Sequence, residues 1–231
     1  MIKLYITVKR CIKIKYNINH NYFNVIDTTE KAYWLGFLYA DGCITDKNDV
    51  ILELSNVDVN HIYKFLNSIE SDHPIKNPKN RNSSRVTIRS KQLASDLIRM
   101  GCTPRKSLTL EYPEWLDTSL DKHFIRGYFD GDGCISRSCY NETRKNRNPE
   151  NKTIVWTVKF TGTYSFLNSI VTRLNIPSNK IISDGTKGYQ LKYGGKKKPL
   201  EVLETFYSDN ILSLDRKYEK YIEFKNEINT A

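Results

Sequence analysis

The chain has few cysteines and histidines, and neither residue type follows the spacing of a disulfide or metal site. Its five cysteines form no Cys-x-x-Cys pair, and their odd number argues against a disulfide framework or a zinc ribbon. The histidines also lack the spacing of zinc ligands (His20, His61, His73 and His123). This usage favours a reducing, intracellular compartment, without distinguishing an organelle from a bacterial or phage-infected cytoplasm.

Long apolar runs are missing as well. The longest helix-like apolar run, Ala32 to Ala40, is shorter than the roughly 20 residues that a membrane-spanning helix needs. The start, Met1 to Leu4, does not begin the signal-peptide pattern of a basic region, an apolar core and a cleavage site. We therefore expect no membrane partner.

Negative charge is scarce relative to positive charge. Asp and Glu number 26 against 36 for Lys and Arg, and the formal net charge is +10. Residues 1–26 contain no acidic residue and form most of a basic extension, placed at 1–28. The pattern fits an arm along a phosphate backbone, an edge strand or a disordered leader equally well. The net charge favours a polyanionic partner, and nucleic acid comes first.

One short pattern occurs twice. The stretch Trp34 to Gly42 reads WLGFLYADG, and Ile125 to Gly133 reads IRGYFDGDG. Each copy is predicted to be a helix that ends in Asp-Gly, with small residues four apart on one face (Gly36 with Ala40, Gly127 with Gly131). Such faces allow two helix backbones to approach closely. Gly42 and Gly133 are expected to be left-handed stops after the helices.

The pattern puts an aspartate at the end of each helix, where the helix dipole disfavours a carboxylate. A single Asp-Gly of this kind is most simply a helix-stop turn. Two helices packed side by side, however, would bring Asp41 and Asp132 together, and like charges at close range need a neutralising partner. The sequence therefore predicts a divalent cation with oxygen preference, above all Mg²⁺.

The order of elements also repeats. Each half is expected to contain a motif helix, a hairpin, a helix, a second hairpin and a closing helix, and the pentapeptide Phe65 to Ile69 returns as Phe166 to Ile170. We therefore divide the remaining chain into repeats at 29–117 and 118–231, the second with a helical tail. The fold class is α+β, with four antiparallel strands per repeat and the helices on one face.

Strand alternation predicts the residues on the open face of each sheet. The strands alternate apolar side chains with basic or hydrogen-bonding ones, as a groove that contacts base edges requires. The residues expected outside are Arg85, Thr87, Arg89, Thr157, Lys159, Gln190 and Lys192.

The two motifs, their register and the repeated element order resemble the LAGLIDADG homing endonucleases in their single-chain, two-motif form. The resemblance covers nearly everything from Asp27 to Tyr221. It implies two αββαββα repeats related by a pseudo-two-fold axis, a monomer, and two saddle-shaped sheets on a long double-stranded DNA site.

The resemblance also implies roles for individual residues. Asp41 and Asp132 match the motif's metal-binding acid and would hold Mg²⁺, with Mn²⁺ as a substitute, and the carbonyls of Ala40 and Gly131 would join them. The family places a basic residue or Gln near each metal, and the positional candidates here are Lys91, Lys196 and Lys197. Each bound site would assist hydrolysis of one phosphodiester per strand.

The sequence departs from the family pattern at two motif positions. Tyr39 stands where the pattern and the second copy (Asp130) have Asp, and Arg126 replaces a small residue. The resemblance therefore favours a site-specific DNA endonuclease that acts in homing, with unequal activity on the two strands as one consequence of Tyr39. The alternative is an RNA maturase that assists intron splicing, or a DNA-binding protein that does not cut. The loop at 137–152 is read either as a contact to flanking DNA or as a disordered segment.

Overall fold

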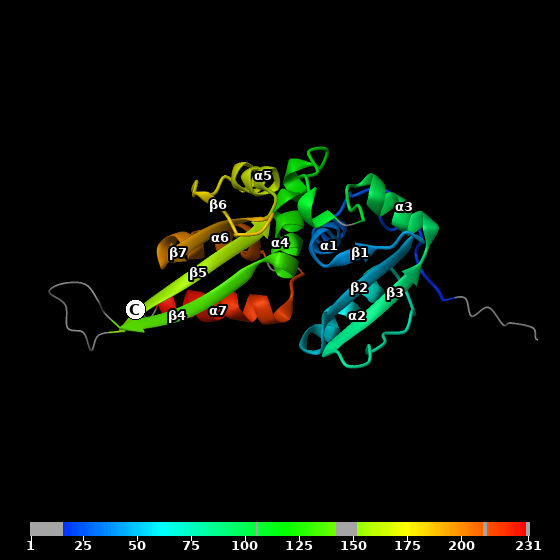
Figure 1. Ribbon diagram of the computed structural model, residues 1–231, viewed down its shortest axis with the longest axis horizontal. Helices are drawn as coiled ribbons and strands as arrows, with labels where there is room; N and C mark the ends of the chain where they lie inside the picture. Colours follow the sequence, from blue (N-terminus) through cyan, green and yellow to red (C-terminus); the bar gives the residue numbers. More distant parts are fainter. Residues whose placement is uncertain (1–15, 105, 142–151, 210–211, 230–231) are drawn as a thin grey trace, which may run out of the picture.

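The structure is a computed structural model, and it describes residues 16–104, 106–141, 152–209 and 212–229 (Figure 1). Most of the basic extension and the central part of the loop at 137–152 lie outside the described residues. In the part of the chain that is described, no helix has the length and apolar character needed to cross a membrane.

The first repeat forms a three-stranded antiparallel sheet in the order β1-β2-β3. Thr28 caps the first helix by accepting a hydrogen bond from the backbone N–H of Lys31, as its type predicts. The elements in chain order are α1 (Thr29–Ala40), β1 (Gly42–Ile44), β2 (Asp49–Ser55), the 3₁₀ helix η1 (Asn56–Asp58), α2 (Val59–Ser68), β3 (Ser83–Arg89), α3 (Lys91–Arg99) and the 3₁₀ helix η2 (Lys106–Leu108).

The second repeat forms a four-stranded antiparallel sheet in the order β4-β5-β7-β6. Its elements are the 3₁₀ helix η3 (Thr118–Leu120), α4 (Asp121–Asp132), β4 (Cys134–Asn141), β5 (Lys152–Gly162), α5 (Tyr164–Leu174), β6 (Ile181–Ser183), β7 (Tyr189–Gly195), α6 (Lys197–Tyr207) and α7 (Asp215–Asn229). The predicted repeat of the element order is thus confirmed, and both sheets contribute to an α+β fold.

The prediction of four strands holds for the second sheet and not for the first. A fourth strand is reduced there to a single bridge between Lys76 and Arg85. Pro74 and Pro78 flank Lys76 at close range. Because proline has no N–H to donate, two prolines so close together prevent a longer ladder.

Strand alternation follows the sequence prediction. Val86 and Ile88 in β3 and Trp156, Val158 and Phe160 in β5 are buried, each with at most 1% of its surface exposed. Their neighbours on the opposite face remain partly or fully exposed, including all seven residues predicted to line a groove. Each sheet therefore has one face in the core and one polar face free of helices.

The motif helices α1 and α4 pack against each other at the centre of the molecule, with a sheet to either side (Figure 1). A Cβ on Gly36 would lie 1.9 Å from the carbonyl oxygen of Phe124, and one on Gly127 would lie 2.0 Å from that of Tyr33. Backbone thus meets backbone at both positions, and no side chain fits between the helices. The predicted role of the small-residue faces is confirmed.

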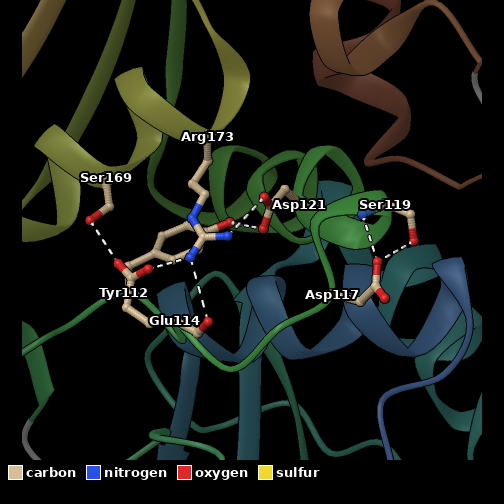
Figure 2. Close-up of polar contacts among 7 residues, drawn as sticks. All are labelled: Tyr112, Glu114, Asp117, Ser119, Asp121, Ser169 and Arg173. Atoms are coloured by element: carbon tan, nitrogen blue, oxygen red, sulfur yellow. Dashed lines mark hydrogen bonds and ion pairs between the residues drawn. The ribbon is translucent and has the colours of Figure 1, made fainter.

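The segment that joins the two repeats, which contains Tyr112, Glu114 and Asp117, packs on the second repeat. Tyr112 donates to the Asp121 carboxylate at 2.7 Å, while Arg173 of α5 forms an ion pair with Glu114 (Figure 2). Ser169 donates to Glu114 at 3.2 Å, and Asp117 caps η3 by accepting from the backbone N–H of Ser119. These contacts fix the direction in which the chain enters α4, and hence where the second motif points.

Gly36→Ala should destabilise the fold, although alanine is ordinarily the better helix former. The new Cβ would strike the Phe124 carbonyl, so the helix backbones would have to separate. Overpacking costs about 1–3 kcal/mol, and a backbone obstacle puts this variant at the upper end. Urea unfolding measures the loss. Gly194→Ala is the control, since an added Cβ meets nothing within 4 Å there. Equal free energies of unfolding for the two variants would contradict the close helix approach.

Candidate active site

The two motif aspartates lie at neighbouring helix ends. Asp41 is the C-cap residue of α1, and Asp132 is the last residue of α4. The position of a Cβ on Gly131 would be 2.2 Å from the Cβ of Ala40 and 3.4 Å from an Asp41 carboxylate oxygen. The small residues that join the helices thus also bring the two acids together, at the end of the axis between the sheets.

The expectation that Gly42 and Gly133 are left-handed stops is wrong. Gly133 has φ −78°, and Gly42 is not among the residues with positive φ. Glycine is required there for space instead, because a Cβ would lie 2.6 Å from the Leu38 carbonyl oxygen at Gly42 and 2.2 Å from the Phe129 ring at Gly133. The chain therefore turns directly from each helix into a strand, with no room for a side chain at the turn.

The pKa values of both aspartates are raised. Burial and then the charge of Asp132 raise the pKa of Asp41 to about 6, although Lys217 and Lys106 act in the opposite direction. Burial also raises the pKa of Asp132, the more exposed of the two side chains, against the same two lysines. Both carboxylates thus resist ionisation, and a bound cation would relieve the cost of placing them side by side.

Two buried lysines flank the aspartates. Lys106 donates to the carbonyl of Gly42, just past α1, and Lys217 of α7 donates to three carbonyls beyond or at the end of α4: Phe129 at 2.6 Å, Gly131 at 3.0 Å and Gly133 at 2.6 Å. Each has no more than 7% of its surface exposed, which is rare for lysine. Burial lowers the pKa of Lys217 to about 8, and the neighbouring carboxylates limit the fall.

Sequence reasoning did not single out these two lysines. It named Lys91, which begins α3, and Lys196 and Lys197 at the start of α6. All three are exposed, and among the described groups the cations that act on both motif aspartates are Lys106 and Lys217. Lys91, Lys196 and Lys197 stay predictions that these contacts do not support. One signal could have found them, because Lys106 and Lys217 are each the first lysine after the closing helix of their repeat.

The donor set fits Mg²⁺. The described residues contain no group of three or more His, Cys, Asp or Glu able to hold a metal. Mg²⁺, however, is commonly bound by one or two carboxylates that share it with substrate phosphates and water, and Asp41 and Asp132 provide such oxygens. The proposed carbonyl ligand of Gly131 already accepts a hydrogen bond from Lys217, so a metal there would share it with the ammonium group.

The polar face of the first sheet carries ion pairs. Glu53 of β2 accepts from the Arg85 Nε at 2.8 Å and from the Ser83 hydroxyl at 2.6 Å, and Arg81 lies 3.4 Å from it. Asp49 lies 3.8 Å from Arg89. Of the two arginines predicted to line a groove, Arg85 is therefore held by a carboxylate on the same face, whereas Arg89 remains 83% exposed beside Asp49.

The polar face of the second sheet differs in charge. Lys159 and Lys192 are directly paired across β5 and β7, and Thr161 is paired with Gln190. Like charges directly opposite each other are unfavourable in an isolated sheet. No ion pair to either lysine is found within the described residues. This face therefore carries positive charge that no neighbouring carboxylate offsets among the described residues.

Arg126, the second departure from the motif, is accommodated inside the protein. Its guanidinium is 1% exposed and donates to the Phe206 carbonyl and the Asp209 carboxylate, both at 2.9 Å. The large side chain thus lies beside Tyr33 of α1, with 5.8 Å from its guanidinium carbon to the ring centre, and ties α4 to the end of α6. The small residues at Gly127 and Gly131 keep the close approach that Arg126 cannot provide.

Comparisons with known proteins agree on the fold. No family model and no curated protein matches the sequence. Among solved structures, the LAGLIDADG homing endonuclease I-LtrWI bound to target DNA matches over 92% of this chain and 91% of its own, with 13% identity and a TM-score of 0.63. The chain has the LAGLIDADG endonuclease fold.

Two further LAGLIDADG proteins show the same likeness. I-AabMI bound to uncleaved DNA covers 88% of this chain and 91% of its own at 12% identity, with a TM-score of 0.60. I-SmaMI bound to cleaved DNA covers 88% and 89% at 10% identity, with a TM-score of 0.56. The fold implied by the two LAGLIDADG motifs is therefore confirmed over nearly the whole chain, although little of the sequence is shared.

Protonation of Asp41 should stabilise the metal-free protein. Folding raises the pKa of Asp41 from its usual 3.8 to about 6, so the folded state binds more protons between these values. The stabilisation is complete below the lower value and is lost as the pH rises through the higher one. At neutral pH with a chelator present, Asp41→Asn should therefore unfold at a higher urea concentration than the wild type. This difference in the urea midpoint should vanish near pH 4. A difference that is independent of pH would contradict the raised pKa.

Proposed function

We propose that this protein is a site-specific, divalent-metal-dependent endonuclease that hydrolyses one phosphodiester on each strand of double-stranded DNA. The proposal depends chiefly on one observation, the meeting of Asp41 and Asp132 at one end of the axis between two sheets with polar faces. The LAGLIDADG fold and the solved relatives bound to target or cleaved DNA support it. Participation in homing and a monomeric state belong to the same proposal.

The residues divide the chemistry among them. Asp41 and Asp132 would hold Mg²⁺, or Mn²⁺ in its place, with the carbonyls of Ala40 and Gly131 as further oxygen ligands. When bound, the metal activates water and stabilises the leaving oxygen. Lys106 and Lys217 are the cations whose charge acts on both aspartates, and they would stabilise negative charge on the phosphate. Because each is fixed to backbone carbonyls, neither has to be ordered at the moment of reaction.

The two polar faces would lie along the major groove and read it differently. On the first sheet, Arg85 is oriented by Glu53, Arg89 is exposed beside Asp49, and Thr87 lies between the two arginines. A fixed guanidinium can contact guanine at two atoms, and a carboxylate can accept from cytosine. On the second sheet, Lys159 and Lys192 contribute charge, while Thr157 and Gln190 contribute hydrogen bonds. The first sheet is thus suited to base discrimination and the second to phosphate affinity.

Asp41→Asn and Asp132→Asn should each abolish double-strand cleavage while leaving most DNA binding intact. An amide is a poor metal ligand, and even changes next to metal ligands cost about 10- to 100-fold, so the loss should reach a hundredfold or more. Cleavage selection from a randomised duplex library in Mg²⁺ would supply the target, and labelled duplex would report the rate.

Asp27→Asn is the matched control for these variants, because Asp27 is exposed at the opposite end of α1. It should cut at the wild-type rate. A wild type that binds duplex and never cuts would exclude the endonuclease. Tighter binding to a folded intron RNA than to any selected duplex would favour the maturase alternative.

Lys159→Gln and Lys192→Gln should each weaken binding across all sequences and reduce the salt dependence of affinity. Each lost phosphate contact lowers the slope of log K against log salt concentration by about 1. Fluorescence anisotropy at several salt concentrations measures the slope. Lys31→Gln is the control, because Lys31 forms a 2.8 Å ion pair with Asp27 near the start of α1. Slopes that match the control in both variants would remove the second sheet from the interface.

A further inference from the structure

The sixth residue of the second motif fixes the segment that carries Lys217. Asp130 is 1% exposed, and one of its carboxylate oxygens accepts from the Tyr33 hydroxyl and from the backbone N–H of Leu214, both at 2.7 Å. The other oxygen accepts from the Tyr207 hydroxyl. Leu214 directly precedes α7 and lies three residues before Lys217 (217 − 214). One residue of α4 thus holds the backbone of the segment whose side chain reaches the end of α4.

The sixth residue of the first motif does the same for Lys106 with different chemistry. The Tyr39 hydroxyl donates to the Met100 carbonyl, six residues before Lys106 (106 − 100). A Cβ on the next residue, Gly101, would lie 2.1 Å from this hydroxyl oxygen, and Gly101 has φ +103°. Cys102 then donates to the Leu38 carbonyl at 3.3 Å. The longer side chain of Tyr39 therefore meets a segment that leaves α3 through a glycine turn.

The first repeat also holds the start of α7. Arg216 pairs with Asp58 at 3.0 Å, and Lys64 pairs with Asp215. Tyr33, which donates to Asp130, comes from α1 and contacts His61 of α2 at 2.9 Å. The placement of Lys217 thus depends on contacts from both repeats, with the Asp130 carboxylate at the centre of them.

We propose that Tyr39 and Asp130 are positioning residues, each of which holds one lysine-bearing segment so that Lys106 and Lys217 serve opposite DNA strands. The proposal depends on the proposed endonuclease function. Neither residue lies at the surface where DNA would bind, since both are at most 2% exposed, so each acts through its lysine. The positioning role also gives a structural reason for a tyrosine at position 39 in place of the motif aspartate. The tyrosine keeps the positioning role with a hydrogen-bond donor where Asp130 uses an acceptor.

Strand-resolved nicking tests this proposal. Each strand of a selected duplex is labelled separately, and single-turnover nicking is measured for Lys106→Met and Lys217→Met to assign a strand to each lysine. Tyr39→Phe should then slow the strand assigned to Lys106, and Asp130→Ala the strand assigned to Lys217. A catalytic group misplaced by about 1 Å can cost up to a hundredfold, so we expect roughly ten- to a hundredfold on one strand. Affinity for the duplex in Ca²⁺ should not change.

Asp130→Asn distinguishes position from charge. An amide oxygen can still accept from Leu214 and Tyr33, and its NH₂ group can donate to Tyr207, so this variant should keep most of the nicking that Asp130→Ala loses. Equal slowing of both strands by Tyr39→Phe or by Asp130→Ala would overturn the proposal. So would slowing of the same strand by both variants. Tyr39→Phe removes a single oxygen and remains informative if Asp130→Ala does not fold.

A crystal structure of each variant separates this proposal from the function on which it depends. Failure of the wild-type protein to cut any duplex would overturn the endonuclease alone. In Asp130→Ala the Lys217 Nζ should leave the Gly131 carbonyl, and in Tyr39→Phe the Lys106 Nζ should leave the Gly42 carbonyl. Retention of both contacts would show that the hydrogen bonds of Tyr39 and Asp130 do not position the lysines, whether or not the protein cuts DNA.

Discussion

The close approach of α1 and α4 is the constraint on which the rest of the structure depends. Because Gly36 and Gly127 each lie against a carbonyl oxygen of the opposite helix, the two repeats have little freedom to slide or rotate at their junction. That junction sets the separation of Asp41 and Asp132, and it sets the angle between the two sheets. One backbone contact thus determines both where the two aspartates meet and how the polar faces of the sheets are oriented.

The charged groups at the candidate site lower the free energy of unfolding. Two carboxylates with raised pKa values lie at helix ends that already disfavour negative charge. Lys106 and Lys217 offset part of this cost, and they do so from buried positions where a lysine is itself unfavourable. The end of the axis therefore lowers the stability of the fold, while the aromatic and aliphatic cores of the two repeats provide the compensating burial.

The repeated parts of the fold and site could be predicted from the sequence, and the unrepeated parts could not. The motif helices, the paired aspartates and the alternation in β3, β5 and β7 are visible because each appears twice or follows a period of two. Lys106 and Lys217 were not predicted because they lie at different sequence separations from their motif aspartates, 65 residues (106 − 41) and 85 residues (217 − 132). Spacing in the sequence therefore gives no sign that they are equivalent.

Other differences have local physical causes. Pro74 and Pro78 shorten the fourth strand of the first sheet, an effect that hydrophobic periodicity alone does not reveal. The glycines after each motif aspartate are needed for space, whereas the familiar Asp-Gly pattern suggested a left-handed turn. The pairing of Arg85 with Glu53 depends on strand register, because the two residues are neighbours only once β2 and β3 align. Register depends on how the strands pair in the folded protein, and amino-acid composition does not determine it.

The anchoring of α7 by both repeats has a consequence for how the protein is made. On the ribosome, both motif helices and both sheets emerge before α7, so the two aspartates can meet while Lys217 is still in the exit tunnel. Asp58 and Lys64 of the first repeat must already be folded when the helix arrives, because they pair with its first residues. The nascent chain thus acquires the second buried lysine only after both motif helices and both sheets. A chain that lacks α7 therefore lacks Lys217 beside the paired aspartates.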